Sequence, residues 1–409
     1  MHMPQRVVIT GMGIWSCLGT SLDEVRDSLY NGRSGIILDP VRKEMGFRSG
    51  LTACLPEPQL KGELPRSQRV YMPQQAQYAY CATRDALRNA GIDQDFLNTR
   101  EVGILYGNDS TADAVYQSVS TIQAKKDTML CGSGAIFQSM NSTVSMNLSV
   151  IFRLKGINLT VSGACASGSH AIGLGALLIR DGLQETIICG GAQEVNAAAT
   201  GSFDGISAFS TRESDPEKAS RPFDRDRDGL VPGGGAATVI LESYESAVRR
   251  GAPILAEVLG YGFSSNGEHI SNPNVEGPQR ALEMSIRQAG ISLDEIGYIN
   301  AHATSTQVGD TNEAKALHAV IGDRRIPVTS TKGQTGHEMW MAGASEIVYS
   351  LLMMQHGFIA PNLNFEHPDE DSARLFIPAE RLSCRFDTFL SNSFGFGGTN
   401  SSLVIRGLR

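Results

Sequence analysis

One cysteine stands in a setting that suits a nucleophile. Cys165 lies in the run VSGACASGSH, directly after a predicted strand and at the start of a predicted buried helix. A helix N-terminus leaves backbone N–H groups unpaired and carries the positive end of the helix dipole. Such positions bring a cysteine pKa from about 8.5 into the range of roughly 3.5–7.5. We therefore expect Cys165 to be a thiolate near neutral pH, and most of the other cysteines to be small buried side chains.

Two histidines and a lysine follow other predicted strands. His302 lies in NAHATSTQVGD, and His337 lies in TKGQTGH with Lys332 five residues before it. Ligands of open α/β sheets bind at the carboxyl ends of strands. The hydroxyls of Thr304 and Thr306 are available there to a polar chain. This set predicts a nucleophile flanked by hydrogen-bond donors.

A metal site is the competing interpretation of these residues. It is disfavoured because no carboxylate or second cysteine stands at ligand spacing and no His-x₃-His pair is present. The run SNSFGFGGTN, residues 391–400, is either a hairpin turn or a loop whose N–H groups approach a reacting oxygen. No G-x-G-x-x-G motif opens a helix, so a dinucleotide site is not supported.

Alternating strands and helices position these residues. The pattern predicts βαβ units with mostly parallel sheets. Gly11, Gly107 and Gly260 are expected to end the strands that precede them. The strand-turn-helix units of the first half weakly resemble those of the second half. This internal echo is either a duplication or an accidental likeness. A duplication would bring the Cys165 and His337 turns to one central site. The expected strands are 6–10, 102–106, 157–161, 186–189 and 236–241, then 254–259, 296–300, 326–329, 388–390 and 402–405.

Composition limits the class of protein. The chain has 409 residues, of which 41% are hydrophobic and 19% charged, and a net charge of -8, so it is not a nucleic-acid binder as a whole. Seven cysteines without a C-x-x-C pair argue against disulfides and zinc and favour the cytoplasm. We expect no signal peptide, and the uncharged stretches 128–152 and 156–179 are too rich in Ser, Asn, Thr and Gly to span a membrane.

Four motifs together resemble the β-ketoacyl-acyl-carrier-protein synthases of the thiolase superfamily. They are VSGACASGSH, AHATSTQVGD, STKGQTGH and SNSFGFGGTN, and the likeness extends to VVITGMGIWSCLG and EKASRPFDRDRDGLVPGGG. The GGG at 233–235 is similar to the elongating type I branch. The resemblance implies an α/β protein with a thiolase-like duplicated αβαβα five-layer fold and a homodimer. It also implies an N-terminal half, 1–250, that carries the nucleophile, and a C-terminal half, 251–409, that carries the histidines and the lysine.

The family carries out decarboxylative Claisen condensation of an acyl chain with malonyl-acyl carrier protein. By this resemblance Cys165 takes the acyl chain as a thioester, while His302 and His337 promote decarboxylation and stabilise the enolate. Lys332 is implied to be an orienting lysine, with Glu313 as its structural partner.

The same resemblance assigns the substrate contacts. The N–H groups of Cys165 and Phe396 would form the oxyanion hole, with Phe396 also the gate of the acyl pocket. Thr304 and Thr306 would hold the phosphopantetheine arm, which arrives on the carrier protein, so that no metal or redox cofactor is required. The carrier is acidic, and Lys61, Arg66 and Arg69 are the candidate docking residues of this acidic chain, with ordinary solvated surface as the alternative.

Several residues depart from the family pattern. Glu338, Met339 and Trp340 follow His337, and the segment 107–113, GNDSTAD, is unusually polar. These changes favour a specialised synthase, for example for polyene chains. Three alternatives stay open: a biosynthetic thiolase, which uses a second cysteine at the GFGG loop; a chain-length factor, which usually loses the nucleophile; and a scaffold whose site Glu338 and Trp340 block.

Overall fold

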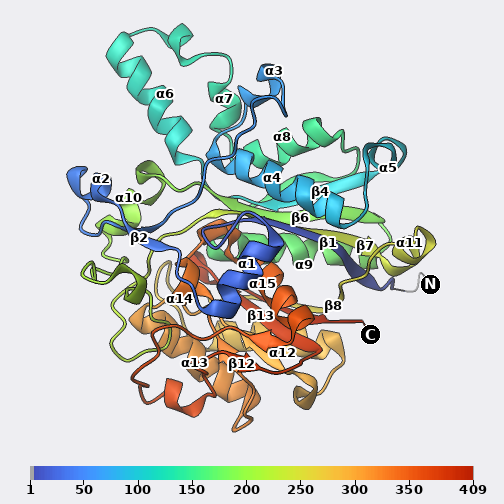
Figure 1. The fold of residues 1–409 in the computed structure, drawn as a ribbon, viewed down its shortest axis with the longest axis vertical. Helices are drawn as coiled ribbons and strands as arrows, with labels where there is room; N and C mark the ends of the chain where they lie inside the picture. The colour runs from blue at the N-terminus through green and yellow to red at the C-terminus, as the bar shows by residue number, and fades with distance from the viewer. Residues whose placement is uncertain (1–3, 409) are drawn as a thin grey trace.

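The computed structural model describes residues 4–408, and its main sheet has ten strands (Figure 1). Their order across the sheet is β10-β9-β13-β14-β8-β1-β7-β6-β4-β5. The strands are β1 (Val7–Trp15), β4 (Val102–Gly107), β5 (Asn158–Val161), β6 (Thr186–Gln193), β7 (Gly235–Ser243), β8 (Ala256–Ser265), β9 (Tyr298–Asn300), β10 (Val328–Thr329), β13 (Thr388–Phe394) and β14 (Thr399–Arg406).

The two halves of this sheet repeat one topology. The order β5-β4-β6-β7-β1 in the first half reappears as β10-β9-β13-β14-β8 in the second. In each half three parallel strands are followed by two antiparallel ones, and β1 meets β8 where Val8 lies opposite Glu257. The internal echo is therefore a duplication. The division at residue 250 stays a prediction, and residues 1–3 and 409, which it includes, lie outside the described part of the chain.

Helices cover and separate the two half-sheets, giving the predicted five layers (Figure 1). The outer helices are α4 (Gln74–Asn89) and α8 (Thr143–Phe152) on the first half, and α12 (Glu276–Ala289) and α13 (Gln307–Ile321) on the second. The middle layer holds α9 (Ser167–Arg180), the helix predicted after Cys165, and α15 (Ala342–His356). The thiolase-like fold is thus confirmed.

Shorter elements complete the fold. The remaining helices are α1 (Leu22–Asn31), α2 (Pro40–Glu44), α3 (Arg66–Arg69), α5 (Gln94–Thr99), α6 (Ala112–Lys125), α7 (Ala135–Gln138), α10 (Ala197–Gly205), α11 (Tyr244–Arg249) and α14 (Lys332–Thr335). The 3₁₀ turns are η1 (Thr128–Cys131), η2 (Ala164–Ala166), η3 (Pro216–Lys218), η4 (Leu293–Glu295), η5 (Met339–Met341), η6 (Ser372–Arg374) and η7 (Phe396–Gly398). Two small sheets pair β2 (Ile36–Leu38) with β3 (Leu51–Ala53) and β11 (Phe358–Ile359) with β12 (Leu382–Ser383).

Small residues let the two middle helices approach. A Cβ on Gly343 of α15 would lie 2.6 Å from the backbone N of Ser169 in α9. Ile172 of α9 and Ile347 of α15 are fully buried in one apolar core that takes side chains from both half-sheets. The chain therefore buries its middle layer between the halves, which brings the starts of α9 and α15 together.

Two predicted strand ends are wrong. β1 continues through Gly11, and β8 continues through Gly260. A Cβ on Gly11 would lie 2.4 Å from the carbonyl O of Ala86 in α4, and one on Gly260 would lie 2.1 Å from that of Ser285 in α12. Glycine inside a strand often marks such a close approach rather than a turn. Gly11 and Gly260 therefore allow an outer helix, α4 or α12, to pack closely on the corresponding strand of each half.

The uncharged stretches 128–152 and 156–179 fall on several separate helices, turns and strands. Within residues 4–408 no helix has the length and apolar character needed to cross a bilayer.

Candidate active site

The nucleophile turn is held by hydrogen bonds on both sides of Cys165. The turn joins β5 to α9, and Ala164 takes a left-handed φ of 45° within it. The Ala164 N–H donates to Asp109 Oδ2 at 3.1 Å. Ser167 Oγ accepts from the Gly163 N–H at 2.9 Å and donates to the Ala164 carbonyl at 2.6 Å. This clamp fixes the sulfur at the start of α9, where Cys165 is 6% exposed.

Burial changes the protonation state expected for this thiol. It raises the pKa of Cys165 to about 12, although the Lys332 ammonium and the backbone N–H groups of Phe396 and Cys165 each lower it. The prediction of a resting thiolate at neutral pH is therefore wrong. The helix end contributes a partial charge, but removing the sulfur from water costs the anion more. Cys165 rests as a neutral thiol and must lose its proton during the reaction.

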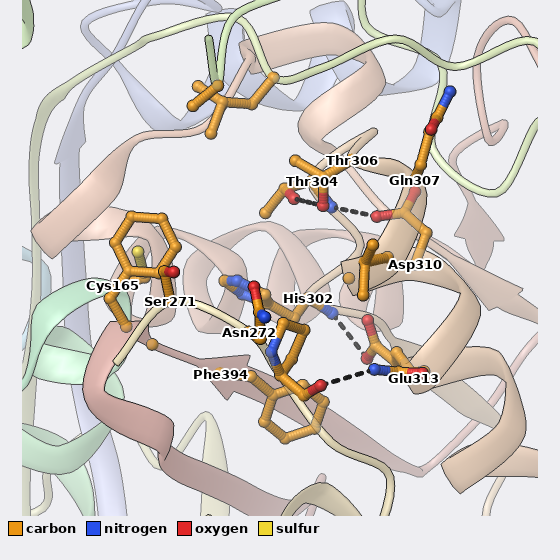
Figure 2. A pocket seen from close by; sticks show the side chains of 18 of the residues that line it. Cys165, Ser271, Asn272, His302, Thr304, Thr306, Gln307, Asp310, Glu313 and Phe394 are labelled. Carbon is orange, nitrogen blue, oxygen red and sulfur yellow. Dashed lines mark hydrogen bonds between the residues drawn. The ribbon is translucent and has the colours of Figure 1, made fainter. Parts of the chain in front are cut away.

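Two buried carboxylates of α13 hold the loop that carries His302 (Figure 2). Glu313 accepts from the backbone N–H groups of His302 at 2.9 Å and Ala303 at 2.7 Å. Asp310 accepts from the Thr304 N–H at 2.9 Å. Because these bonds are made by the backbone, the loop after β9 is fixed whichever way its side chains point.

The predicted partner of Lys332 is wrong. The Lys332 ammonium forms its ion pair with Glu346 of α15, and both side chains are almost fully buried. Glu313 is instead a structural support for the His302 loop. The sequence reasoning missed Glu346 because it lies within an apolar helix and belongs to none of the motifs. An acidic residue in the run MAGASEIVYSLLMM was the available signal.

A tight turn aims His337 into the same site. Its N–H donates to the Val231 carbonyl at 2.7 Å, and its carbonyl accepts from the Gly233 N–H at 2.8 Å. Gly336 has a φ of 65°, and a Cβ there would lie 2.6 Å from the Val231 oxygen. Only glycine fits that position, and the pairing with residues 231–233 fixes the direction of the ring.

The cysteine and both histidines converge. One ligand atom from each of Cys165, His302 and His337 lies within 4.8 Å of the others, and the two imidazole rings are 5.3 Å apart at 87°. Both ring nitrogens of His337 and Nδ1 of His302 are buried without a hydrogen-bond partner in the described structure. Burial, reinforced by the Lys332 charge, lowers the pKa of both rings. At neutral pH the histidines are therefore uncharged rings able to donate N–H bonds.

The same convergence bears on the metal alternative. Cysteine and histidine atoms this close could hold a metal ion. Local spacing in the sequence does not exclude such a site, because the three residues come from three separate segments. The family resemblance, rather than spacing, distinguishes the nucleophile interpretation.

The glycine-rich segment forms the tip of the β13–β14 hairpin and lies against the nucleophile turn. A Cβ on Gly395 would lie 3.1 Å from the backbone N of Cys165. The backbone N–H groups of Phe396 and Cys165 both form hydrogen bonds with the Cys165 sulfur. Phe396 is 40% exposed and its ring lies parallel to that of Phe203, with centroids 6.1 Å apart. Two N–H donors and an aromatic ring thus surround the position where a thioester carbonyl would sit.

A cavity of about 740 Å³ leads to this cluster. It is lined by Cys165, both histidines, and Thr304 and Thr306, whose hydroxyls lie 3.0 Å apart. The loop 266–274 also lines it, and Figure 2 shows Ser271 and Asn272 of that loop among the lining side chains. Sequence reasoning missed this loop, although the polar run SNGEHISNPN after a strand is typical of a binding loop.

The candidate docking residues lie outside this cavity. Lys61 and Arg66 are exposed, whereas Arg69 is half-buried and its Nε donates to the Leu64 carbonyl at 3.1 Å. The structure brings together the predicted catalytic and substrate-binding residues but not these three.

Comparisons with known proteins agree with the motifs. The model for the β-ketoacyl synthase N-terminal domain matches residues 4–247, and that for the C-terminal domain matches residues 255–366. The 3-oxoacyl-[acyl-carrier-protein] synthase 1 of Escherichia coli K12 is 37% identical, covering 99% of this chain and 100% of its own.

Solved structures give the same result. A β-ketoacyl synthase from Burkholderia phymatum is 36% identical with a TM-score of 0.95, covering 99% of this chain and 100% of its own. A type II polyketide ketosynthase, solved with its acyl-carrier protein and bound to the hexaketide, is 29% identical with a TM-score of 0.90 and the same coverage.

Proposed function

Because the chain belongs to the β-ketoacyl synthase family, we propose a specific role in its reaction for each residue of the Cys165 cluster. The chain is an acyltransferase with 3-oxoacyl-acyl-carrier-protein synthase activity, which serves fatty acid elongation. The observation that supports the residue roles best is the convergence of one thiol, two uncharged imidazoles and two backbone N–H groups at the end of one cavity.

Acyl transfer uses the nucleophile turn. The Cys165 sulfur attacks the thioester carbonyl of the incoming acyl group, and the N–H groups of Cys165 and Phe396 stabilise the oxygen as it becomes negative. The thiol proton leaves through an imidazole within 4.8 Å and ends on the departing phosphopantetheine sulfur. Thr304 and Thr306 bind the phosphopantetheine arm along the cavity, and Phe396 closes over the acyl group.

Condensation uses the histidine pair. His302 and His337 donate N–H bonds to the malonyl thioester oxygen, on which negative charge develops as CO₂ leaves. A single well-placed donor of this kind is worth about 3–4 kcal/mol in the transition state. The resulting carbanion attacks the acyl carbonyl, and the C–S bond to Cys165 breaks as the product 3-oxoacyl thioester forms. The Cys165 thiolate that leaves takes up one proton from water and returns to the resting thiol. Lys332 orients the pair through its charge and its bond to Glu346.

Carrier-protein docking is proposed at Lys61, Arg66 and Arg69, together with Lys125 and Lys126. Figure 1 shows α3, which spans Arg66–Arg69, and α6, which ends at Lys125, on the outer side of the first half-sheet. Charge reversal at Arg66 and Arg69 should raise the KM for acyl carrier protein more than it lowers kcat. The reason is that it weakens the association with the carrier protein and leaves the reaction at Cys165 unchanged. Arg287→Glu on the exposed face of α12 is the matched control. An unchanged KM in the Arg66 and Arg69 variants would rule these residues out.

A homodimer is proposed through the free edge of the sheet. β5 is its terminal strand, and an unpaired edge is a template for another chain. Leu159 of β5 is 54% exposed, and Val150 of the contacting helix α8 is 69% exposed. Large exposed apolar patches mark interaction sites. Phe137 lines a surface pocket together with Val150. Further exposed apolar side chains lie on α6 and on η1 and α7, which contact α6: Tyr116, Val119, Met129, Leu130 and Ile136.

A non-catalytic role, as a scaffold or chain-length-factor-like partner of another ketosynthase, is the second candidate. It is favoured by Met339 and Trp340, which belong to the same small apolar cluster as Cys165. Release of ¹⁴CO₂ from labelled malonyl carrier protein separates the two, and we expect release that Cys165→Ala reduces strongly. Absence of release by the wild type with any acyl group would favour the scaffold.

A further inference from the structure

His170 connects the helix that begins at the nucleophile to the glycine-rich loop. It lies in the first turn of α9, five residues after Cys165. Its Nε2 lies 2.7 Å from the Thr399 hydroxyl at the start of β14, and its Nδ1 lies 2.6 Å from the Tyr261 hydroxyl of β8. Because α9 belongs to the first half of the chain and both strands belong to the second, one imidazole joins the two halves beside the site.

The same ring packs against the nucleophile turn. A Cβ on Gly163 would lie 3.1 Å from His170 Cδ2, so the ring occupies the space beside the backbone two residues before Cys165. This is the segment whose N–H donates to Ser167 Oγ and so fixes the start of α9. His170 therefore contacts the backbone that positions the Cys165 N–H.

The second oxyanion donor, the Phe396 N–H, lies in a loop made mostly of glycine. Gly395 precedes Phe396, and Gly397 and Gly398 follow it with left-handed φ angles of 76° and 75°. Glycine has more backbone freedom than any other residue, so neighbouring contacts must hold this N–H in place. Thr399 closes the loop, because its carbonyl accepts from the Gly395 N–H at 2.7 Å.

Two segments hold this loop from different sides. On one side the Gly397 N–H donates to the Ile270 carbonyl at 2.6 Å, and the Asn266 N–H donates to the Gly398 carbonyl at 2.9 Å. Those bonds come from the loop 266–274, most of which is exposed, with Ile270 77% exposed. The bond from His170 comes instead from a helix of the middle layer, which gives it the firmer base.

His170 is an uncharged ring at neutral pH, because burial lowers its pKa to about 4. An uncharged imidazole has one N–H donor and one acceptor nitrogen, and a hydroxyl can serve as partner to either. Both of its hydrogen bonds can therefore form at once. Within residues 4–408, His170 is not among the residues that line the cavity at Cys165, so it acts through Thr399 and does not touch the substrate.

We propose that His170 is the positioning residue of the oxyanion hole and, through Thr399, holds the Phe396 N–H in register with the Cys165 N–H. The inference rests on the proposed role of these two N–H groups. Acylation of the thiol and attack by the carbanion both place negative charge on the acyl oxygen at Cys165, so both depend on this register. Loss of CO₂ does not, because its charge develops on the malonyl oxygen that the histidine pair binds.

Thr399→Val tests the bond with little change of shape, because a methyl group replaces the hydroxyl. The measurement is the rate of Cys165 acylation by saturating hexanoyl carrier protein, followed by intact mass. We expect a fall of about tenfold or more, since removal of a whole oxyanion donor costs about 10²–10³-fold. Thr399→Ser keeps the hydroxyl and should restore the rate. Thr388→Val, which removes a buried hydroxyl at the far end of the same strand pair, is the control.

Equal acylation rates in the wild type and Thr399→Val would overturn the proposal. So would equal losses in Thr399→Val and Thr399→Ser, because the hydroxyl would then not be the group that matters.

The fate of the malonyl carbanion gives a readout that a general loss of structure would not move. Enzyme loaded with a hexanoyl group is mixed with malonyl carrier protein, and the carrier products are resolved by mass spectrometry. A carbanion that does not attack the acyl carbonyl takes a proton from water and leaves as acetyl carrier protein. We expect the acetyl share to rise severalfold in Thr399→Val, while the rate of CO₂ release stays close to that of the wild type. A CO₂ release that falls in step with condensation, without acetyl carrier protein, would contradict the inference.

His170→Asn tests the ring itself, because its shorter amide takes the place of Nδ1 and not of Nε2. It should show the same slow acylation and the same acetyl product. Combined with Thr399→Val it should be no slower than the slower single variant, since both changes remove one bond. Losses that add would show two independent effects and overturn the proposal. Failure of the hexanoyl group to load on Cys165 of the wild type would instead contradict the proposed function itself.

Discussion

Burial in the folded protein changes the pKa of Glu338, and this change has a measurable effect on stability. Burial raises the pKa of its carboxyl from 4.5 to about 8, while the hydroxyls of Ser345 and Tyr349 lower it. The folded pKa lies above the unfolded one, so the unfolded chain releases this proton first as pH rises. Stability contributed by the protonated carboxyl is complete below about pH 4.5 and is lost progressively towards about pH 8.

We predict that Glu338→Gln removes the loss of stability that the wild type shows as the pH rises. The amide keeps its oxygen for the Tyr349 hydroxyl and can donate to the Ser345 hydroxyl, while no proton is released. The unfolding free energy of the variant minus that of the wild type should increase as the pH rises from 5 to 8, by at most about 1.4 kcal/mol per pH unit. Urea unfolding at each pH checks this, with Glu380→Gln at an exposed position as the control. A difference that does not change with pH would contradict the account.

The protonated thiol gives a second prediction at this scale. Because burial raises the pKa of Cys165 to about 12, the rate of Cys165 alkylation by iodoacetamide should keep increasing between pH 7 and 9.5. Peptide mass spectrometry measures it, with the exposed Cys54 alkylated in the same sample as the reference. A rate that is already constant at pH 7 would indicate a resting thiolate.

Individual residues show what sequence can and cannot predict. Cys165, His302, His337 and Lys332 were identified because each follows a strand end in a recognisable motif. The pairing of Lys332 with Glu346 and the neutral state of the thiol were not, because both depend on how deeply separate segments are buried together. Burial depth is a property of the assembled layers.

At the scale of elements, two glycines mark contacts with helices rather than the ends of strands. Gly11 and Gly260 lie within β1 and β8 and admit α4 and α12, where the sequence pattern predicted strand ends. The positions of the main strands along the chain and the helix after Cys165 were predictable from the sequence pattern, but the order of the strands within one mixed sheet was not. The close approaches were not, because the partner helix follows each glycine only after many intervening residues.

The contact between the middle helices can be tested at one glycine. Gly343→Ala would place a Cβ 2.6 Å from Ser169 in α9, so the helices must shift, and we expect a loss of about 1–3 kcal/mol in unfolding free energy. Gly205→Ala at the end of α10 meets nothing within 4 Å and should change stability little. Denaturant unfolding of both variants provides the comparison. Equal stabilities would show that the middle layer is looser than described.

At the scale of the whole molecule, the duplication explains why one site uses both halves. The Cys165 turn comes from the third strand-to-helix unit of the first half, and the His337 turn comes from the corresponding unit of the second. The sequence pattern left duplication and accident open, because the repeated strands share few residues. The matching strand orders distinguish them.

The free edge of β5 gives the prediction for assembly. Leu159→Glu, combined with Val150→Glu, should convert a dimer into a monomer, because it places charges on the proposed apolar contact. Leu183→Glu is the control, since Leu183 is 64% exposed but lies in the turn after α9. Light scattering after size-exclusion chromatography measures the mass. A wild type that is monomeric at every concentration would contradict the proposed homodimer.

The most direct test of the central claim follows the acyl group through Cys165. Wild-type protein is mixed with hexanoyl carrier protein, its intact mass is recorded, and malonyl carrier protein is then added. We predict one hexanoyl group on Cys165 that is discharged as 3-oxo-octanoyl carrier protein, no adduct in Cys165→Ala, and an adduct that persists in His302→Ala or His337→Ala. Formation of 3-oxo-octanoyl carrier protein by Cys165→Ala at the wild-type rate would contradict the account.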